Sequence, residues 1–515
     1  MSSLNSTVNP IVVARPDREA SGSRARRAVW IVALVVLFST AAIYESTHLS
    51  ALTRPEVWVH LRTGSWILEN RAIPHTGLFS QYPNLAWSDS SWLFDALLGV
   101  TYKLFGLRAI PILLMLLKVV IAAGTFLLAY SRRGDFWKAV GLSVLAQYVL
   151  SGLQPLPYVF SILFFAIELG LLVGSRRSGS ARGLWLLPLL FFVWANLHIQ
   201  FGAGLVMLGV FLIASLIEHW LRSMDVNWMS RRIVLLPLIQ VSAISAASLL
   251  ATFATPYGFR LLPAVFRTLY SDVAFEHFAE MASMSFRRPQ DYLLMLLVMF
   301  AFLALGRRRS LEVFELFILL GGTAVAFRIQ RDTWLALLPA IVVLSTTSFV
   351  EFRENDSQSK TLRAWEWGAV AATTAMVLVV AMVRLPDRNA LMNRISQNFP
   401  VRACDYIASS SLSKPLFNEY SWGSFLTWYL PEYPVVVDSR AELYGGDMLT
   451  KYFDVVGGKE RLDFDPMVAG AGTLLLERNS AMAKAMKDLP ALSSQYRLVY
   501  SDELADVFVP TNNER

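Results

Sequence analysis

The sequence predicts a polytopic α-helical membrane protein that carries an α/β domain at its C-terminal end. Hydrophobic residues make up 55% of the 515 residues and charged residues only 17%, and the mean hydropathy is +0.46. Soluble domains carry about 25% charged residues, so most of this chain is expected to have lipid as its solvent. The 12% aromatic content argues against disorder, and a single cysteine excludes a disulfide framework or a Cys-rich metal site.

Apolar runs recur throughout residues 28–383, which we assign to a transmembrane domain behind an N-terminal tail of residues 1–27. A helix needs about 20 apolar residues to cross the hydrocarbon core. We predict about eleven spans, some of which need flanking residues to reach full length. They are residues 29–44, 109–130, 137–150, 158–174, 184–194, 201–217, 233–253, 292–305, 311–327, 334–350 and 368–383.

Lysine and arginine residues predict the orientation, because they concentrate in cytoplasmic loops. With the N-terminal tail in the cytoplasm, the inside segments hold Arg15, Arg18, Arg24, Arg26, Arg27, Arg132, Arg133, Arg176, Arg177, Arg182, Arg222, Arg231, Arg232, Arg307, Arg308, Arg309, Arg353, Lys360 and Arg363. The net charge of +7 is therefore a signal of topology and gives no reason to expect a nucleic acid partner. Three long segments are expected outside: residues 45–108, 254–291 and 384–515.

The first outside segment combines two amphipathic stretches with a set of ionisable residues. Residues 57–70 and 91–105 are too short and too polar to span, so they are expected to lie in the membrane interface. Polar and aromatic candidates accompany them: Glu56, Trp58, His60, Arg62, His75, Asp89 and Asp95. A carboxylate can take a proton from an incoming hydroxyl, and Arg or His can stabilise a phosphate leaving group. The alternative is that the aromatic residues only pack and the polar residues only face water.

Several short motifs are spread over the chain. An acidic residue precedes W-x-H-x-x-x-G and P-x-T-x-x-F-S, and the matching residues are Glu56, Trp58, His60, Gly64, Pro74, Thr76, Phe79 and Ser80. Further elements are Trp87, Trp92 and Leu93, W-A-N-L-H at 194–198, T-P-Y-G at 255–258, N-E-Y-S-W-G-S at 418–424 and V-D-S-R-A-E-L-Y-G at 437–445. With these motifs the chain resembles the GT-C superfamily of membrane glycosyltransferases, and within it the bacterial dolichyl-phosphate-mannose mannosyltransferase-like group.

This resemblance implies a GT-C-like fold in a bacterial cytoplasmic (inner) membrane. It implies an integral-membrane glycosyltransferase that moves a sugar from a polyprenyl-phosphate-linked donor to a glycan, lipid or protein acceptor on the outer face. Glu56 is then the catalytic acid/base candidate, although the loop acid of GT-C enzymes is usually Asp. The substrate-binding candidates are Trp58, His60, Arg62, His75, Asn196, His198, Arg328 and Arg331.

Two other functions stay open at this stage. One is a non-catalytic receptor or assembly scaffold on a GT-C-like fold, in which the C-terminal domain binds the partner. The other is a transporter, which is disfavoured because the two halves show no repeat and no paired broken helices. No organic cofactor is expected. The chain has no H-x-x-x-H or H-E-x-x-H pattern, and the binding of a divalent metal ion stays an open alternative.

Two charges lie deep within predicted spans, and ionisable residues at such depth are usually paired or functional. Lys118 and Glu168 are at similar depth, so we predict that they form an ion pair, with a proton or ion path as the alternative.

Residues 384–515 alternate strand-like and helical runs, as in an α/β domain. The strand-like runs are 415–417, 434–437, 473–476, 496–500 and 507–509. Asp438 and Arg440 follow the second run, and they are interpreted either as part of an acceptor site or as a strand-end salt bridge.

Overall fold

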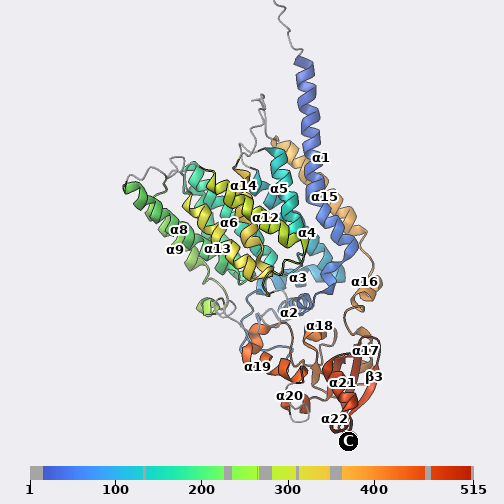
Figure 1. Ribbon diagram of the computed structural model, residues 1–515. Coiled ribbons are helices and arrows are strands. Elements are labelled where there is room, and N and C mark those ends of the chain that lie inside the picture. The colour runs from blue at the N-terminus through green and yellow to red at the C-terminus, as the bar shows by residue number, and fades with distance from the viewer. Residues whose placement is uncertain are drawn as a thin grey trace, which may run out of the picture.

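A computed structural model describes residues 16–130, 135–224, 235–263, 265, 281–308, 312–347, 362–458 and 465–511, with side chains from residue 24 onward. Several residues that predict the orientation lie outside this part: Arg15, Arg132, Arg133, Arg231, Arg232, Arg309, Arg353 and Lys360. The chain forms a helical bundle with a smaller layered segment at one end (Figure 1).

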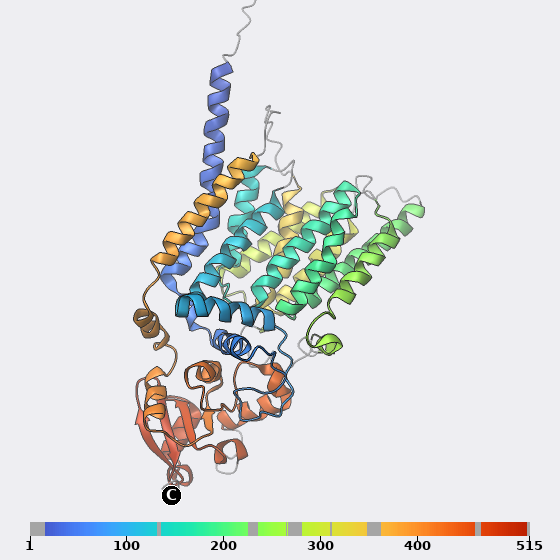
Figure 2. The ribbon, with the colours of Figure 1, turned by 180° about the vertical axis from the view of Figure 1, so that it is seen from behind.

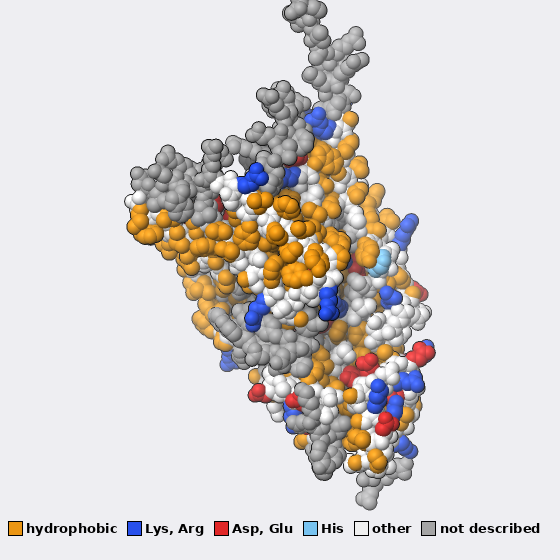
Figure 3. All heavy atoms as spheres, in the orientation of Figure 1, with side chains coloured by type: hydrophobic (Ala, Val, Ile, Leu, Met, Phe, Trp, Pro, Cys, Tyr) orange, Lys and Arg blue, Asp and Glu red, His pale blue; other side chains and the backbone are white. Residues whose placement is uncertain are grey.

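Each apolar run that the sequence predicts coincides with a helix of the bundle. These are α1 (Pro16–His48), α4 (Ala109–Ala129), α5 (Phe136–Val149), α6 (Tyr158–Ser178), α7 (Leu187–Leu197), α8 (Phe201–Ser223), α9 (Leu238–Ala251), α12 (Pro289–Gly306), α13 (Val313–Arg328), α14 (Trp334–Ser345) and α15 (Ala364–Val383). Figure 3 shows apolar side chains covering the bundle, with charged side chains gathered toward its upper end and on the lower part of the molecule. Such an apolar surface fits a lipid environment.

Six helical stretches of the described residues are long and apolar enough, by length and composition, to cross a membrane. They are Arg24–His48, Trp92–Ala129, Tyr158–Ser178, Phe201–Ser223, Pro289–Gly306 and Ala364–Val383. The other five bundle helices have 11 to 16 residues, short of the usual span. The multi-pass architecture is therefore clear, and the count of eleven crossings stays a prediction.

Two helices of the first outside segment lie between the bundle and the C-terminal segment (Figure 2). They are α2 (Glu56–Asn70) and α3 (Trp92–Phe105), close to the two amphipathic stretches of the sequence. They cross with backbones in direct contact, because a Cβ atom added to Gly64 would lie 1.9 Å from the Asp95 carbonyl oxygen. Gly99 is equally confined, since its Cβ would lie 2.7 Å from the Gly64 carbonyl carbon. Only glycine permits this approach.

The C-terminal segment, which follows α15, contains a four-stranded sheet with helices packed around it. The strands are β1 (Leu416–Asn418), β2 (Thr473–Glu477), β3 (Tyr496–Ser501) and β4 (Ala505–Pro510), in the order β1-β2-β4-β3. The β1–β2 pair is parallel, and the β2–β4 and β3–β4 pairs are antiparallel. The helices are α16 (Arg388–Ile395), α17 (Val401–Ser409), α18 (Tyr420–Tyr429), α19 (Ala441–Val456), α20 (Pro466–Ala469), α21 (Ala481–Asp488) and α22 (Pro490–Ser493).

The predicted strand at 434–437 does not form a regular strand, and the reason involves the first outside segment. Val435 makes isolated parallel bridges to Leu416 of β1 on one side and to Ser80 on the other. Gln81 N donates to the Val435 carbonyl oxygen at 2.9 Å, and Val435 N donates to the Phe79 carbonyl oxygen at 3.1 Å. Val435 therefore extends the sheet beyond β1 by one residue, and the loop around Ser80, some 350 residues earlier in the chain, pairs with Val435.

Aromatic packing forms a second contact between α2 and the C-terminal segment. Trp58 of α2 is fully buried, with ring centroids 5.8 Å from Phe399, 5.4 Å from Phe425 and 4.7 Å from Trp428. Large rings buried in this way contribute much of the packing energy of a core. The juxtamembrane layer and the C-terminal segment therefore share one hydrophobic core.

The predicted ion pair between Lys118 and Glu168 is wrong. Lys118 Nζ lies 3.0 Å from Glu45 Oε2, near the end of α1, and both side chains are buried. Glu45 also accepts hydrogen bonds from Ser50 Oγ at 2.8 Å and from Ala51 N at 3.0 Å. Glu168 lies apart, and neither of its carboxylate oxygens has a hydrogen-bond partner among the described residues. Depth in the membrane was a poor guide to pairing because α1, not α6, supplies the acid.

Candidate functional site

The first cluster of ionisable side chains gathers where α2 meets α3. His60 Nδ1 lies 2.7 Å from Asp95 Oδ1, and Asp95 is almost completely buried. His60 retains about a fifth of its side-chain exposure, 21%. Burial lowers the pKa of His60, while the nearby carboxylates of Asp89, Glu442 and Glu56 act in the opposite direction. The imidazole is therefore expected to be neutral near pH 7 and to act as a hydrogen-bonding group.

Asp89 is the second buried acid of this cluster. Its Oδ1 accepts a hydrogen bond from Ser91 N at 3.0 Å, which fixes the turn that leads into α3. Burial raises the pKa of Asp89 well above its ordinary value, and the negative charge of Asp95 raises it further. Two carboxyl groups that share a small buried space cannot both ionise easily. A buried carboxyl group whose protonated form is favoured can act as a proton donor, which is one part of acid/base chemistry.

A histidine and an arginine approach the same region from the bundle. His198 caps the end of α7, and its Nδ1 lies 2.8 Å from Ser161 Oγ, which also accepts from Trp194 Nε1 at 2.8 Å. Burial lowers the pKa of His198 well below its ordinary value, and the charges of Arg331 and His60 lower it further. These interactions show that His198, His60 and Arg331 share one electrostatic environment. Arg331 itself contacts Asp332, with its Nε 3.5 Å from Oδ1.

The loops around this cluster are held by side-chain hydrogen bonds. Asn196 is buried, and its Oδ1 accepts from Trp92 Nε1 at 3.0 Å while its Nδ2 donates to the Ala254 carbonyl oxygen at 3.1 Å. Tyr257, from the T-P-Y-G motif, donates its hydroxyl to the Pro74 carbonyl oxygen at 2.8 Å. Asn196 and Tyr257 therefore tie three outside loops together, which is a positioning function.

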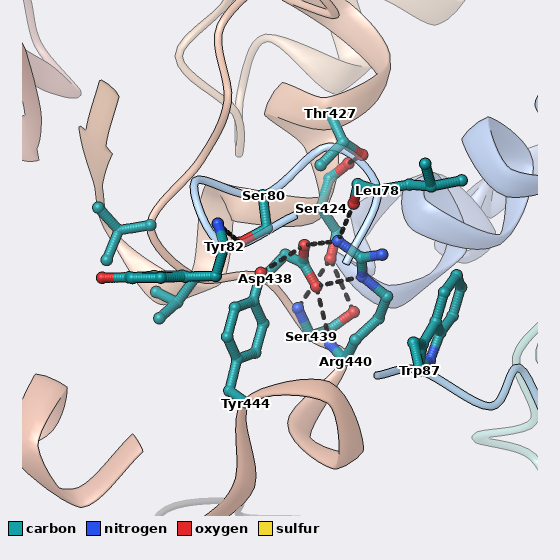
Figure 4. A network of polar contacts seen from close by, with 12 residues as sticks. Leu78, Ser80, Tyr82, Trp87, Ser424, Thr427, Asp438, Ser439, Arg440 and Tyr444 are labelled. Atoms are coloured by element: carbon teal, nitrogen blue, oxygen red, sulfur yellow. Dashed lines mark hydrogen bonds and ion pairs between the residues drawn. The ribbon is translucent and has the colours of Figure 1, made fainter. Parts of the chain in front are cut away.

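A second polar network joins the C-terminal segment to the first outside loop (Figure 4). Arg440 Nε lies 2.9 Å from Asp438 Oδ1, its Nη2 lies 2.6 Å from Asp438 Oδ2, and both side chains are buried. Tyr444 donates its hydroxyl to Asp438 Oδ2 at 2.9 Å, and Arg440 Nη2 also donates to the Leu78 carbonyl oxygen at 2.7 Å. The structure thus contains the predicted salt bridge, and the same arginine holds the first loop.

Arg440 also connects the two clusters. Its guanidinium carbon lies 4.7 Å from the Trp87 ring centroid, and Trp87 Nε1 donates to Glu442 Oε1 at 3.3 Å. Arg440 interacts electrostatically with Asp95, which is the partner of His60. The sequence marks Arg440 as a candidate but does not predict its contacts with the first loop. Nothing local in V-D-S-R indicates contacts with residues 78–95.

The structure brings several predicted site residues together and leaves others apart. Glu56 is the first residue of α2 and interacts electrostatically with His60 and Tyr420. Trp58 is fully buried among aromatic rings, and its role in substrate binding stays a prediction. Arg328 is exposed at the end of α13, and His75 is exposed with its ring 5.3 Å from Tyr257.

A metal site in a protein is usually built from several His, Cys, Asp or Glu side chains around one point. Within the described ranges, no three of these residues are placed to hold one metal ion together. The acids of the first cluster instead contact His60 and backbone amides.

The fold has relatives among solved structures, whereas no protein-family model and no curated protein matches the chain. The oligosaccharyltransferase AglB from the archaeon Archaeoglobus fulgidus, in complex with an inhibitory peptide and a dolichol-phosphate, matches with a TM-score of 0.55 at 12% identity, over 94% of this chain and 75% of that chain. Its apo form matches with a TM-score of 0.52 at 11% identity, over the same shares. ArnT from Cupriavidus metallidurans, bound to undecaprenyl phosphate, gives a TM-score of 0.48 at 14% identity, over 96% and 99% of the two chains.

The two AglB likenesses and the apolar helices define the class of protein: a multi-pass membrane protein with a GT-C-like fold. The resemblance that the sequence motifs indicate is thereby confirmed for the fold. At 11–12% identity the AglB likeness concerns the fold alone, so the activity has to be argued from the site.

Proposed function

We propose that the protein is an integral-membrane glycosyltransferase that moves a sugar from a polyprenyl-phosphate-linked donor to an acceptor on the outer face. The observation that carries this proposal is the buried cluster of His60, Asp89 and Asp95 beside Arg331 and His198. It lies where α2 and α3 pack beside the bundle, and we expect the lipid head group to enter there. The GT-C-like fold supports the same class of reaction by analogy.

The chemistry assigns different tasks to acids and cations. An acceptor hydroxyl attacks the anomeric carbon, the bond from that carbon to the carrier phosphate oxygen breaks, and the hydroxyl proton passes to a carboxylate. Glu56 is our catalytic acid/base candidate from the sequence. Burial favours the protonated form of Asp89, so Asp89 is a candidate donor of a proton to the departing phosphate. Arg331 would stabilise the departing phosphate through charge, and neutral His198 and His60 through hydrogen bonds.

The topology completes the proposal. We infer a bacterial cytoplasmic-membrane location with the N-terminus inside, about eleven crossings, and residues 384–515 as an extracytoplasmic α/β domain. The arginine bias of the inside segments supports this orientation. Arg62, His75, Asn196 and Arg328 complete the proposed substrate-binding set, with Asn196 acting through the loops that it holds.

The proposal is tested with the full chain in lipid nanodiscs, a radiolabelled polyprenyl-phosphate sugar and a membrane extract as acceptor. We expect transfer of label by the wild type, and a loss of about 100-fold or more in the variant that lacks the catalytic acid. Glu56→Gln and Asp89→Asn separate the two candidates, and Glu69→Gln, an exposed acid near the end of α2, is the matched control. Absence of transfer across a panel of donors, with binding of an outside partner, would favour the scaffold instead.

A further inference from the structure

Two arginines from distant parts of the chain meet at one aromatic ring. The guanidinium carbon of Arg62, on α2, lies 4.9 Å from the Phe79 ring centroid. The guanidinium carbon of Arg440 lies 5.7 Å from the same centroid. Phe79 has a backbone φ of +68°, which is rare for a residue with a Cβ atom and shows that the loop is held firmly here. The two cations therefore belong to one small region between α2 and the C-terminal segment.

Both guanidinium groups retain buried N–H donors. Arg440 uses Nε and Nη2 on Asp438 and the Leu78 carbonyl oxygen, but its Nη1 is buried and has no acceptor within the described part of the chain. Figure 4 shows one nitrogen of Arg440 on the side away from Asp438, reached by no dashed line. Arg62 Nε is likewise buried without an acceptor in the described ranges. A buried donor without an acceptor costs about 1–3 kcal/mol, so both positions favour a ligand that accepts hydrogen bonds.

The charges of the region favour an anion. The Arg440 charge is balanced by Asp438, with which it forms a two-pronged ion pair. Arg62 has no carboxylate within ion-pair distance in the described part of the chain, so its charge beside Phe79 is not paired directly.

The shape of the acceptor favours a phosphate over a carboxylate. The two oxygens of a carboxylate lie in one plane, and the fork of a single arginine occupies one edge of that plane. A phosphate ester offers more free oxygens at tetrahedral angles, so it can accept from two guanidinium groups that approach from different sides.

We propose that Arg62 and Arg440 bind a phosphate group between α2 and the C-terminal segment. The proposal deepens the proposed function, on which it rests for the sources of that ligand: the head group of the polyprenyl-phosphate carrier, or a phosphate in the surrounding water. It also makes the C-terminal segment a direct contributor to the binding site, because Arg440 belongs to it.

The test measures binding without transfer, so its failure is distinct from failure of the proposed enzyme activity. Calorimetric titrations use the full chain in nanodiscs with three probes: inorganic phosphate, a polyprenyl phosphate, and the corresponding polyprenol. Saturable binding of inorganic phosphate alone would indicate a water-borne ligand. Binding of the polyprenyl phosphate but not of the polyprenol would indicate the carrier head group.

The variants assign the binding to the two arginines. We expect Arg62→Gln to weaken phosphate binding about tenfold or more, since a hydrogen bond to a charged group is worth roughly 1.5–3 kcal/mol. Arg440→Lys keeps a cation opposite Asp438 but loses the fork, so it should also weaken binding while the fold persists. Arg54→Gln, an exposed arginine just before α2, is the control and should bind as the wild type does.

Three results would overturn the proposal. They are no saturable binding of either phosphate by the wild type, unchanged affinity in Arg62→Gln, or an equal loss in Arg54→Gln, which would indicate nonspecific attraction. Thermal unfolding of each variant shows whether a loss of affinity reflects a lost fold instead. If Arg440→Lys proves unfolded, Arg62→Gln still decides, because Arg62 is not part of the buried Asp438 ion pair.

Discussion

His60 and Asp95 form a 2.7 Å hydrogen bond across two helices whose backbones touch at Gly64 and Gly99. The bond and the contact depend on one another. Gly64 lies one turn after His60 on α2, and Gly99 lies one turn after Asp95 on α3. The spacing W-x-H-x-x-x-G therefore has a physical meaning, because it places His60 and the glycine that allows the close approach of α3 on one face of α2.

Replacing Gly64 by alanine tests this relationship. The new methyl group would lie 1.9 Å from the Asp95 carbonyl oxygen, so α2 and α3 must separate. We expect a loss of about 1–3 kcal/mol in the free energy of unfolding. Transfer activity should fall as well, because the hydrogen bond between His60 and Asp95 lengthens. Thermal unfolding and the transfer assay measure the two effects.

The matched control is Gly141→Ala. Gly141 lies within α5, and no atom would come within 4 Å of an added Cβ. This change should leave activity unchanged and stabilise the helix slightly, if at all. Equal behaviour of the two alanine variants would show that the contact between α2 and α3 does not organise the site.

The buried acid Asp89 predicts an unusual pH dependence of stability. Its pKa is raised by burial in the folded chain, so between its ordinary value and the folded one the folded state binds an extra proton. The free energy of unfolding then falls as pH rises through that window. Asn cannot ionise, so Asp89→Asn should be more stable than the wild type at pH 8. The advantage should shrink as the pH is lowered toward the ordinary pKa of 3.8, below which Asp89 is protonated in both states.

Unfolding temperatures measured from pH 4.5 to 8 check this expectation. Glu69→Gln is the control, because Glu69 is exposed near the end of α2. A constant difference between Asp89→Asn and wild type over the whole range would mean that Asp89 stays ionised when folded.

The positions of the bundle helices follow from hydropathy, whereas the partners of buried charges do not. Each apolar run has a helix because lipid-facing and core-facing residues are both apolar, so the pattern is visible locally. The partner of Lys118 is Glu45, which lies one residue beyond the first predicted span, at 29–44. Which helix packs beside which is decided by contacts far apart in the chain, and equal depth in the membrane does not report it.

A double-mutant cycle tests the ion pair between Lys118 and Glu45. Removing one partner, in Lys118→Met or Glu45→Gln, leaves a buried charge or an unmatched polar group. We expect about 3–5 kcal/mol of destabilisation for each single change. The double variant should lose much less than the sum, since both charges are then gone. Unfolding in mixed detergent micelles supplies the free energies.

Glu168 provides the comparison within the same bundle. Glu168→Gln combined with Lys118→Met should be additive within roughly 0.5 kcal/mol, because no contact joins the two residues. Strong coupling between Lys118 and Glu168, with none between Lys118 and Glu45, would reverse our assignment.

In the candidate site as well, the sequence indicates which residues are candidates but not which distant residues they contact. The candidates His60 and Asp95 are recognisable from the sequence because ionisable side chains stand out in an apolar context. The attachment of Arg440 to Leu78 and Trp87 is not, because it depends on how residues 78–87 pack against a segment some 350 residues later. The strand predicted at 434–437 is absent from the sheet for the same reason: Val435 pairs partly with the first loop, which is distant in the chain.

The aromatic packing around Trp58 predicts that α2 and the C-terminal segment unfold together. Trp58 packs against Phe399, Phe425 and Trp428, so Trp58→Ala would open a cavity between α2 and α18. We expect about 3–5 kcal/mol of destabilisation and faster proteolysis of the C-terminal segment. Trp137→Ala, whose side chain is 53% exposed on α5, should change neither property. If the C-terminal segment of Trp58→Ala resists protease as in the wild type, α2 is not part of its core.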